Sequence, residues 1–217
     1  TLTCMPWDGA KGGVLVISVS GQLTLSANID VTGKGFRGGS QCFNTSAECG
    51  SPNLDYSYNV SSGLGAEKGE SICKTNPLKN GGMGAWANGG GGGNKQNAGG
   101  GGGGNFTQGG KGGNQTSMCT TIPIGGEGGV FLEYKQDKLF LGGGGGCSDN
   151  NDKVGTAGGN GGGLVIIEAN HLTANGFSVL TNGATVPVIE NTIGHGTCAG
   201  GCGVRTRVNS HPIDGCP

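Results

Sequence analysis

Glycine constrains this chain more than any other feature, because 53 of its 217 residues are glycine. A glycine held in a regular element costs about 0.5–1 kcal/mol relative to alanine in lost backbone entropy, and it adds no apolar surface to a core. An ordinary enzyme core is therefore not expected. Intrinsic disorder usually accompanies a large net charge, whereas the net charge here is only −1. We expect the glycine to be structural.

The glycine is concentrated in the middle of the chain, where 33 of the 53 lie between Gly81 and Gly163. Three runs, at 89–93, 99–104 and 142–146, have five or six glycines each. In the polyproline II conformation such a run extends roughly 16–19 Å, the length of a short strand. A helix with three residues per turn has three faces, and glycine on all three lets other backbones pack on every side. The runs therefore predict a polyglycine II bundle.

An internal repeat of two apolar segments begins at Gly12 and at Gly162. At an offset of 149 residues, the matching pairs are Leu15/Leu164, Val16/Val165, Ile17/Ile166, Leu23/Leu172, Thr24/Thr173 and Thr32/Thr181. Each copy reads as strand, polar turn and strand, so we expect two hairpin-like units packed together. A further hairpin is expected over 130–141.

These features predict a single all-β module, in which short strands or hairpins pack with a polyglycine II helix bundle. We expect disulfide staples and essentially no α-helix. The expected order is a first strand unit over 1–40, a cysteine-containing surface insertion over 41–80, the polyglycine core over 81–163, a second strand unit over 164–190 and a cysteine-rich tail over 191–217.

The cysteine content predicts an oxidising, extracellular compartment. The nine disulfide candidates are Cys4, Cys42, Cys49, Cys73, Cys119, Cys147, Cys198, Cys202 and Cys216. The odd count leaves one thiol free, paired between chains, or paired with a residue outside this span. Four N-x-Ser/Thr motifs fit the same compartment, and the N-glycosylation candidates are Asn44, Asn59, Asn105 and Asn114. Because the sequence begins at Thr1, we expect a mature or excised segment.

Two motifs resemble catalytic motifs but lack what the corresponding mechanism requires. The strings at 193–201 and 115–123 resemble the histidine and serine motifs of subtilisin-type proteases, but they stand in the reverse order and no aspartate motif accompanies them. The spacing of His195, Cys198 and Cys202 suits zinc, with His171 or Cys216 as a fourth ligand.

Disulfides explain such cysteines without a metal. The segment 148–152 offers oxygen ligands for calcium but lacks the EF-hand spacing. We therefore predict no catalytic, cofactor or metal site. Charged residues make up only 12% of the chain and are balanced in sign, so no nucleic-acid partner is expected, and no apolar stretch is long enough to span a membrane.

Three segments, at 12–39, 88–106 and 140–170, carry a family resemblance. The chain resembles glycine-rich, adhesin-like domains of large secreted or surface-anchored bacterial proteins over most of residues 7–190. Its glycine runs alone are similar to the polyglycine bundles of some phage tail adhesins, of springtail antifreeze proteins and of the glycine-rich domain of the anaplastic lymphoma kinase receptor family. The resemblance implies a structural and adhesive role, with no catalytic residues to carry over.

We therefore expect a non-enzymatic extracellular module that self-associates into a surface fibre or filament and that can carry covalent glycans. One alternative is an adhesin module that binds glycans or a protein through residues 41–80 and the polar connectors. A lesser alternative is an ice-binding protein, since a flat polyglycine bundle presents ordered arrays of small residues.

Overall fold

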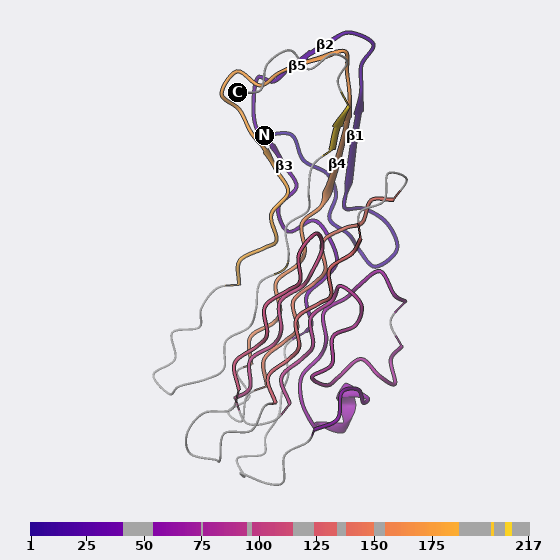
Figure 1. The fold of residues 1–217 in the computed structure, drawn as a ribbon, viewed down its shortest axis with the longest axis vertical. Coiled ribbons are helices and arrows are strands. Elements are labelled where there is room, and N and C mark those ends of the chain that lie inside the picture. Colours follow the sequence, from indigo (N-terminus) through magenta and orange to yellow (C-terminus); the bar gives the residue numbers. More distant parts are fainter. Residues whose placement is uncertain are drawn as a thin grey trace.

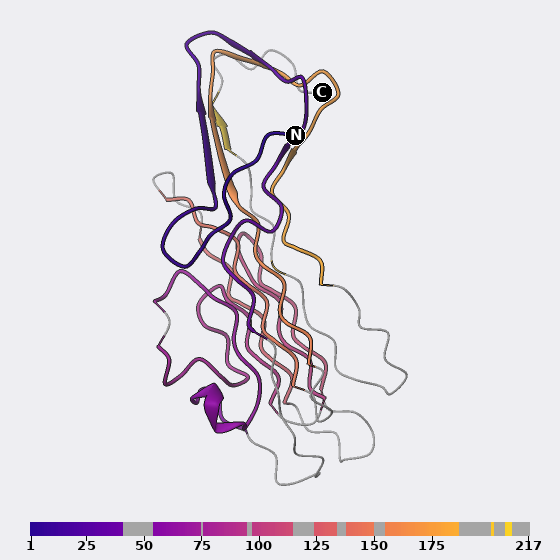
Figure 2. The ribbon, with the colours of Figure 1, turned by 180° about the vertical axis from the view of Figure 1, so that it is seen from behind.

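The computed structural model describes residues 1–40, 54–74, 76–94, 97–114, 124–133, 138–149, 155–186, 201 and 207–209, the last three by their backbone alone. Over these residues the molecule is long, with a three-sided ring of strands at one end and a bundle of extended segments at the other (Figures 1 and 2). The described part contains no α-helix and one short 3-10 helix, η1, Val60–Ser62. No helix within it has the length and apolar character needed to cross a membrane. The prediction of a β-rich, non-helical class is confirmed at this level.

The ring of strands is a three-sided parallel solenoid of two stacked turns (Figure 1). The first rung consists of β1 Val14–Ser18, β2 Gln22–Thr24 and β3 Ile29–Asp30. The second rung consists of β4 Leu164–Glu168, β5 His171–Thr173 and β6 Val179–Leu180. Each strand of one rung pairs in parallel with its counterpart in the other, and β7 Arg207–Asn209 adds to β4 on the far side.

The repeat is therefore real, but the expected hairpins are wrong. β1 and β2 do not pair with each other, because the polar turn between them is a corner that carries the chain to the next side of the ring. The predicted register is right at Leu23 and Leu172 and one residue off at Leu15, which pairs with Val165. The apolar run at 164–167 matches β1 at either register, and the choice is set by which of its side chains face the interior.

The solenoid interior is an apolar core, and its burial differs between the two rungs. The core contains Leu25, Ile29, Val31, Val165, Ile167 and Ala169, all buried. On the β4 side Val165 and Ile167 are 0% and 1% exposed, whereas their partners Leu15 and Ile17 in β1 are only half-buried. The second rung lies between β1 and β7, while the first rung forms an end of the stack, which we call the open end.

The bundle is held together by backbone hydrogen bonds with a period of three residues. Successive N–H groups of segment 142–147 donate in turn to three neighbours, 159–162, 101–104 and 67–70, and then repeat the cycle. The bonds are Gly142 to Gly162 (3.0 Å), Gly143 to Gly104 (3.0 Å), Gly144 to Glu70 (3.0 Å), Gly145 to Gly159 (2.9 Å), Gly146 to Gly101 (2.8 Å) and Cys147 to Glu67 (2.9 Å). A β-strand bonds to neighbours in one plane, so this segment is not a strand of a sheet.

Glycine is required in the bundle because the backbones approach too closely for a side chain. A Cβ on Gly101 would meet the carbonyl oxygen of Glu127, and a Cβ on Gly146 would meet that of Gly91. The obstructing atoms belong to other backbones, which cannot rotate away as a flexible side chain would.

Asparagine closes the ends of the glycine runs. Asn88 and Asn94 flank the run 89–93, Asn105 follows the run 99–104, and all three side chains are buried. Asn105 donates to the carbonyl of Leu141 (3.1 Å), and Asn88 donates to it as well (3.2 Å). An amide both donates and accepts, so it satisfies backbone groups at the ends of segments that have no further neighbour.

One expected boundary differs from the structure. Residues 65–70, placed in a surface insertion by the sequence, lie in the bundle, where Ala66 is fully buried and bonds to Gly93. The hairpin expected over 130–141 lies partly outside the described residues; in the described part Lys138 is a bridge residue, and the N–H of Leu132 donates to the carbonyl of Asn105 (2.6 Å).

Solenoid and bundle meet at a second apolar cluster. Phe36, Leu141 and Leu164 are buried there, and Trp7 packs against them. The Trp7 and Phe36 rings meet edge to face, with centroids 5.6 Å apart and planes at 87°. This cluster joins residues from the N-terminal segment, the bundle and β4.

Candidate functional site

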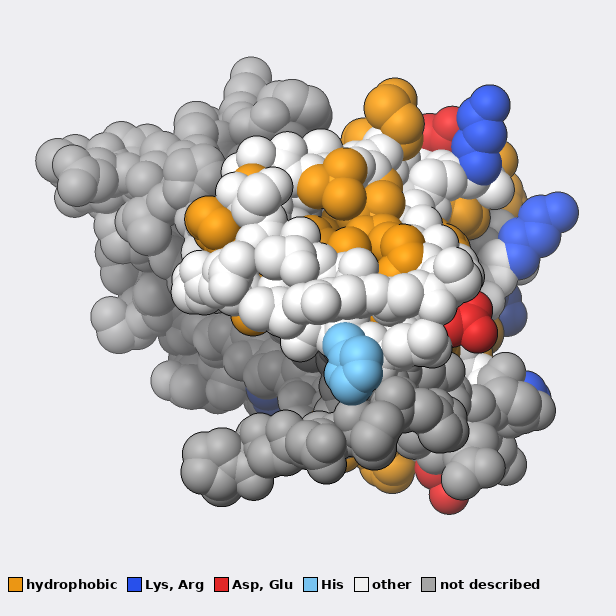
Figure 3. All heavy atoms as spheres, turned by 90° about the horizontal axis from the view of Figure 1, so that it is seen from above, with side chains coloured by type: hydrophobic (Ala, Val, Ile, Leu, Met, Phe, Trp, Pro, Cys, Tyr) orange, Lys and Arg blue, Asp and Glu red, His pale blue; other side chains and the backbone are white. Residues whose placement is uncertain are grey.

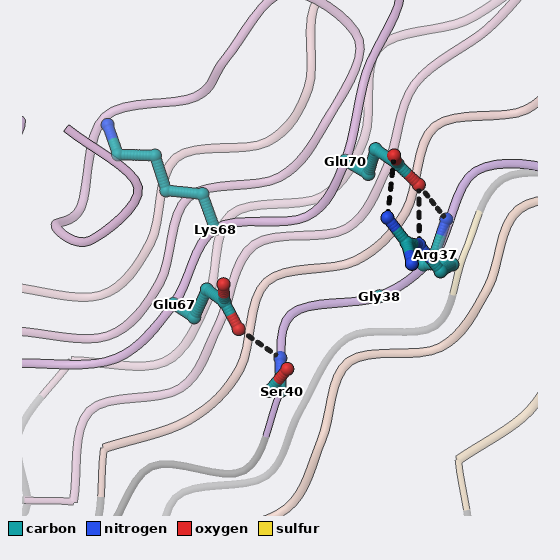
Figure 4. A pocket seen from close by; sticks show the side chains of 6 residues that line it. All are labelled: Arg37, Gly38, Ser40, Glu67, Lys68 and Glu70. Carbon is teal, nitrogen blue, oxygen red and sulfur yellow. Dashed lines mark hydrogen bonds and ion pairs between the residues drawn. The ribbon is translucent and has the colours of Figure 1, made fainter. Parts of the chain in front are cut away.

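A polar pocket of about 270 Å³ lies where residues 37–40 run beside residues 67–70. Its lining residues are Arg37, Gly38, Ser40, Glu67, Lys68 and Glu70 (Figure 4). The two segments are held together by their backbones, since the N–H of Glu70 donates to the carbonyl of Arg37 (2.9 Å). No sequence motif predicted this site, although three charged residues in four, Glu67, Lys68 and Glu70, are unusual in a chain so poor in charge.

Glu70 is fully engaged within the protein. It accepts hydrogen bonds from Trp7 Nε1 (3.0 Å) and from the backbone N, Nε and Nη2 of Arg37 (3.0, 3.1 and 3.1 Å). Burial alone would raise the pKa of Glu70, but the hydrogen bonds from Arg37 and Trp7 outweigh it and lower that pKa below its ordinary value. Arg37 also donates to the carbonyl of Asp8 (3.2 Å). Together these residues clamp the N-terminal segment to the bundle.

Glu67 faces the pocket with a less complete set of partners. Its carboxylate accepts from the backbone N–H of Ser40 (2.7 Å) and from Nδ2 of Asn80 (3.3 Å). Figure 4 shows this carboxylate and Ser40 on one side of the pocket and the clamp of Arg37 and Glu70 on the other. Glu67 is thus the lining carboxylate best placed to accept a hydrogen bond from a ligand.

Lys68 turns away from the pocket (Figure 4). Its Nζ donates to the carbonyl of Tyr56 (2.5 Å) and to Oγ of Ser57 (2.8 Å), and the residue is only 6% exposed. Burial lowers the pKa of Lys68 to about 8. The ammonium group therefore holds residues 56–57 by hydrogen bonds and adds no charge to the pocket.

The chemistry of this pocket is that of hydrogen bonding. It offers a carboxylate, a hydroxyl and backbone groups, and its one guanidinium is already paired. Such a set suits a hydroxylated ligand such as a sugar. Among the described residues, no group of three or more histidine, cysteine or acidic side chains is gathered as a metal site would need.

Three of the cysteines predicted to form disulfides are described, and each has different surroundings. Cys4 packs against the solenoid core, Cys73 is exposed and Cys147 is buried in the bundle, and no disulfide joins any two of these three. Burial raises the pKa of the Cys4 thiol, and nearby Lys34 offsets only part of that rise. The remaining candidates, Cys42, Cys49, Cys119, Cys198, Cys202 and Cys216, lie outside the described residues.

The glycosylation candidates differ in their surroundings. Asn114 is exposed, and Asn59 caps η1 by accepting from the N–H of Ser61 (3.0 Å). Asn105 is 8% exposed, and the nitrogen that would carry a glycan donates to the carbonyls of Phe140 and Leu141. A glycan on Asn105 is incompatible with these contacts. Asn44 lies outside the described residues.

The motifs rejected in the sequence analysis are largely outside the described part, including Ser117, His195, Cys198 and Cys202. His171 is exposed on β5. Of the segment proposed and rejected for calcium, Ser148 and Asp149 are buried in the bundle.

A second candidate surface is the open end of the solenoid. Figure 3 views the solenoid from above, across its stacking direction, and shows hydrophobic side chains gathered among the described residues there. At this end Leu2 and Met5 are 48% and 78% exposed, and the inward side chains of β1 are half-buried. A patch of this kind is typical of a surface that meets another protein.

A comparison of the chain with models of known families, with curated proteins and with solved structures finds no significant match.

Proposed function

We propose that this chain is a non-enzymatic, extracellular structural and adhesive module that self-associates into a surface fibre or filament. The observation that supports this most is an open face on an outer bundle segment, 109–113. The N–H groups of Gly109 and Gly112 donate to Gly129 and Gly126 (both 2.8 Å), which engages one face of the segment. The carbonyls of Gly110 and Gly113 accept from Gly102 and Gly99 (both 2.8 Å), which engages a second face.

On the third face of that segment, two N–H groups have no partner among the described residues. No described group accepts from the N–H of Gly110 or Gly113, and a Cβ on either would meet open space. Backbone groups left unpaired in this way form a template on which another chain can continue the lattice, as at the edge of a sheet. A fibre subunit needs such a face, whereas an isolated module gains nothing from it.

We also propose that the glycine segments adopt the polyglycine II conformation and that disulfides staple the module. The period of three in the hydrogen bonds supports the former, as does the absence of positive φ angles from the runs 89–93, 99–104 and 142–146. NMR couplings that report φ near −75° in the runs would support it further.

The test of fibre formation is electron microscopy of the oxidised, untagged protein beside a non-reducing gel. We expect filaments for the wild type, none for Gly110→Lys, and unchanged filaments for Gln108→Lys. The control adds the same charge at an exposed neighbouring position while leaving the glycine face open. Uniform monomers for the wild type would overturn the proposal.

The polar pocket favours one alternative, a module that binds glycans. Its support is the carboxylate of Glu67 beside the hydroxyl of Ser40 in a cavity of about 270 Å³. A glycan screen tests it, with Glu67→Gln expected to reduce any binding at least tenfold. The control is Glu127→Gln at the half-buried partner of Lys111, outside the pocket, which should leave binding unchanged. A blank screen with wild-type protein would dismiss this alternative.

A further inference from the structure

Within the described part of the chain, the outer edge of β1 has no paired strand. The N–H of Val19 donates to Glu168 and the N–H of Leu164 donates to Gly13 (2.9 and 2.8 Å), which fixes the odd-numbered residues of β1 as those that bond to β4. In a parallel pair, alternate residues face the partner. The N–H and C=O groups of Val14, Val16 and Ser18 therefore face away from β4, and no described residue bonds to them.

At the same end of the solenoid, the edge of β3 is paired, unlike the edge of β1. Leu2 donates to Asn28 and accepts from Asp30 (both 2.9 Å), so the N-terminal segment extends the stack on that side. The first rung thus accepts an added parallel segment over β3, whereas no described segment occupies the equivalent position over β1.

The β1 edge also lacks the features that keep edges apart. Solitary edge strands are commonly protected by lysine, proline, a bulge or a covering loop. The sequence of β1, Val-Leu-Val-Ile-Ser, contains no charge and no proline, and its register with β4 runs without a bulge. Val14 and Val16 are moreover 42% and 63% exposed.

The core beneath this edge is open as well. Leu15, Ile17 and Val19 are half-buried, although Val165, Ile167 and Ala169 at the equivalent places of the second rung are buried. The difference arises because nothing in the described part stacks on the first rung at β1. A further strand added at this edge would bury Leu15, Ile17 and Val19, just as the first rung buries Val165, Ile167 and Ala169.

We propose that this edge pairs with the β1 edge of a second copy of the chain across a two-fold axis. This inference rests on the proposed self-association and assigns it a second, specific surface. An isologous contact needs a self-complementary surface, and an uncharged edge with an apolar core behind it meets that need. Two antiparallel β1 strands would exchange backbone bonds through Val14, Val16 and Ser18, and their half-buried side chains would merge into one core. A net charge of −1 per chain opposes this approach only weakly.

Proline at residue 16 tests the proposal cleanly. The N–H of Val16 faces the free edge, so Val16→Pro removes no bond within the chain, whereas it blocks a partner strand. The matched control, Val16→Thr, keeps the β-branched shape and the N–H. Molecular mass is measured by light scattering across a concentration series, in oxidised protein that also carries Gly110→Lys so that association through the bundle does not contribute.

We expect dimers for the Gly110→Lys background and for Val16→Thr, with dissociation constants within about threefold of each other, and at least tenfold weaker association for Val16→Pro. Equal association of Val16→Pro and Val16→Thr would overturn the proposal, as would an open-ended series of masses in place of a dimer. Monomers in the Gly110→Lys background beside wild-type filaments would overturn this inference alone. A wild type that never associates would overturn the proposed function with it.

Hydrogen exchange keeps the proposal falsifiable if the proline variant does not fold. In the Gly110→Lys background, the amides of Val14, Val16 and Ser18 should gain at least tenfold protection on concentration, while those of Leu15 and Ile17 are already protected when dilute. Exchange at Val14, Val16 and Ser18 that does not depend on concentration would overturn the β1 contact.

Discussion

The solenoid and the bundle solve the same packing problem in opposite ways. Both lay extended segments side by side and join them through the backbone, but the solenoid spaces its three sides with inward side chains such as Ile29 and Ile167, while the bundle brings backbones together with nothing between them. The solenoid is thus stabilised by apolar burial and the bundle by hydrogen bonds that saturate three faces. Removing atoms should harm the first, and adding atoms should harm the second.

The largest expected effect is from adding one methyl group to the bundle. Gly101→Ala places a Cβ against the backbone of Glu127 and Gly126 and should cost more than about 3 kcal/mol, because neither backbone can yield. Gly110→Ala meets open space and should leave stability within about 0.5 kcal/mol of wild type. Denaturant unfolding of both variants measures the difference. Equal stability would mean that the bundle packs more loosely than described.

The next effect comes from removing atoms from the solenoid. Ile167→Ala should destabilise the protein by about 2–5 kcal/mol, since the side chain is 1% exposed. Ile17→Ala, at the paired position of the first rung, should cost about half as much, because Ile17 is already half exposed. Urea unfolding at concentrations where the protein is monomeric gives both values. An equal loss at the two positions would show that the open end is covered.

Replacing Asn88, which precedes the glycine run 89–93, should cause an intermediate loss of stability. In Asn88→Ala, the carbonyls of Gly104 and Leu141 keep other donors, but the N–H of Ile72 loses the side-chain oxygen that accepts from it (3.0 Å). Asn88 itself is fully buried and makes three hydrogen bonds, each of which contributes about 0.5–1.5 kcal/mol, so their loss should cost about 1–3 kcal/mol in total. Calorimetry of this variant against the exposed substitution Asn182→Ala checks the value, and two equal melting temperatures would refute the role of Asn88.

A smaller effect should appear as a pH dependence from Lys68, one of the few titratable groups buried near the bundle. Its folded pKa of about 8 lies below the ordinary 10.5, so the unfolded chain binds more protons between these values. Stability should therefore rise as the pH increases from about 8 to 10.5, by on the order of 1–2 kcal/mol. Lys68→Met should remove this rise. A flat profile for the wild type would argue that water reaches the amine.

The smallest effect should come from the clamp at Glu70. Its pKa is lowered in the folded state, so it contributes stability above its ordinary value of 4.5, and this contribution is lost as the pH falls through the folded pKa. Glu70→Gln should flatten that acid limb and cost under about 1 kcal/mol at neutral pH, because the partner side chain of Arg37 is 53% exposed. The measurement is the free energy of unfolding as a function of pH in the acid range, with Glu127→Gln as the control. A pH dependence that Glu70→Gln leaves unaltered would exclude the clamp.

The sequence predicted the parts of this fold that repeat and missed those that depend on neighbours. Runs of glycine and the match between Leu23 and Leu172 are local patterns, and both led to the correct regions. Whether a repeat forms hairpins or stacks on itself depends on which strands meet, and alternating apolar residues do not distinguish the two.

The candidate site was harder to predict. The pocket needs Arg37 and Glu70 side by side, although 33 residues separate them, and Ala66 joins the bundle without belonging to a glycine run. The edge of β1 was likewise invisible, because only the pairing pattern shows which residues of Val14–Ser18 face outward. In each case the missing information is a contact between distant segments.

The order of the rungs along the chain has a consequence for biosynthesis. β3 ends at Asp30 and its partner rung begins only at Leu164, so most of the bundle is made between the two halves of one solenoid. At about 5–20 residues per second, a ribosome takes on the order of ten seconds to cover that interval. During this time β1 lacks its partner β4, and its uncharged strand can pair with another nascent chain. Protection of the first rung during synthesis is thus a requirement that this topology places on the cell that makes it.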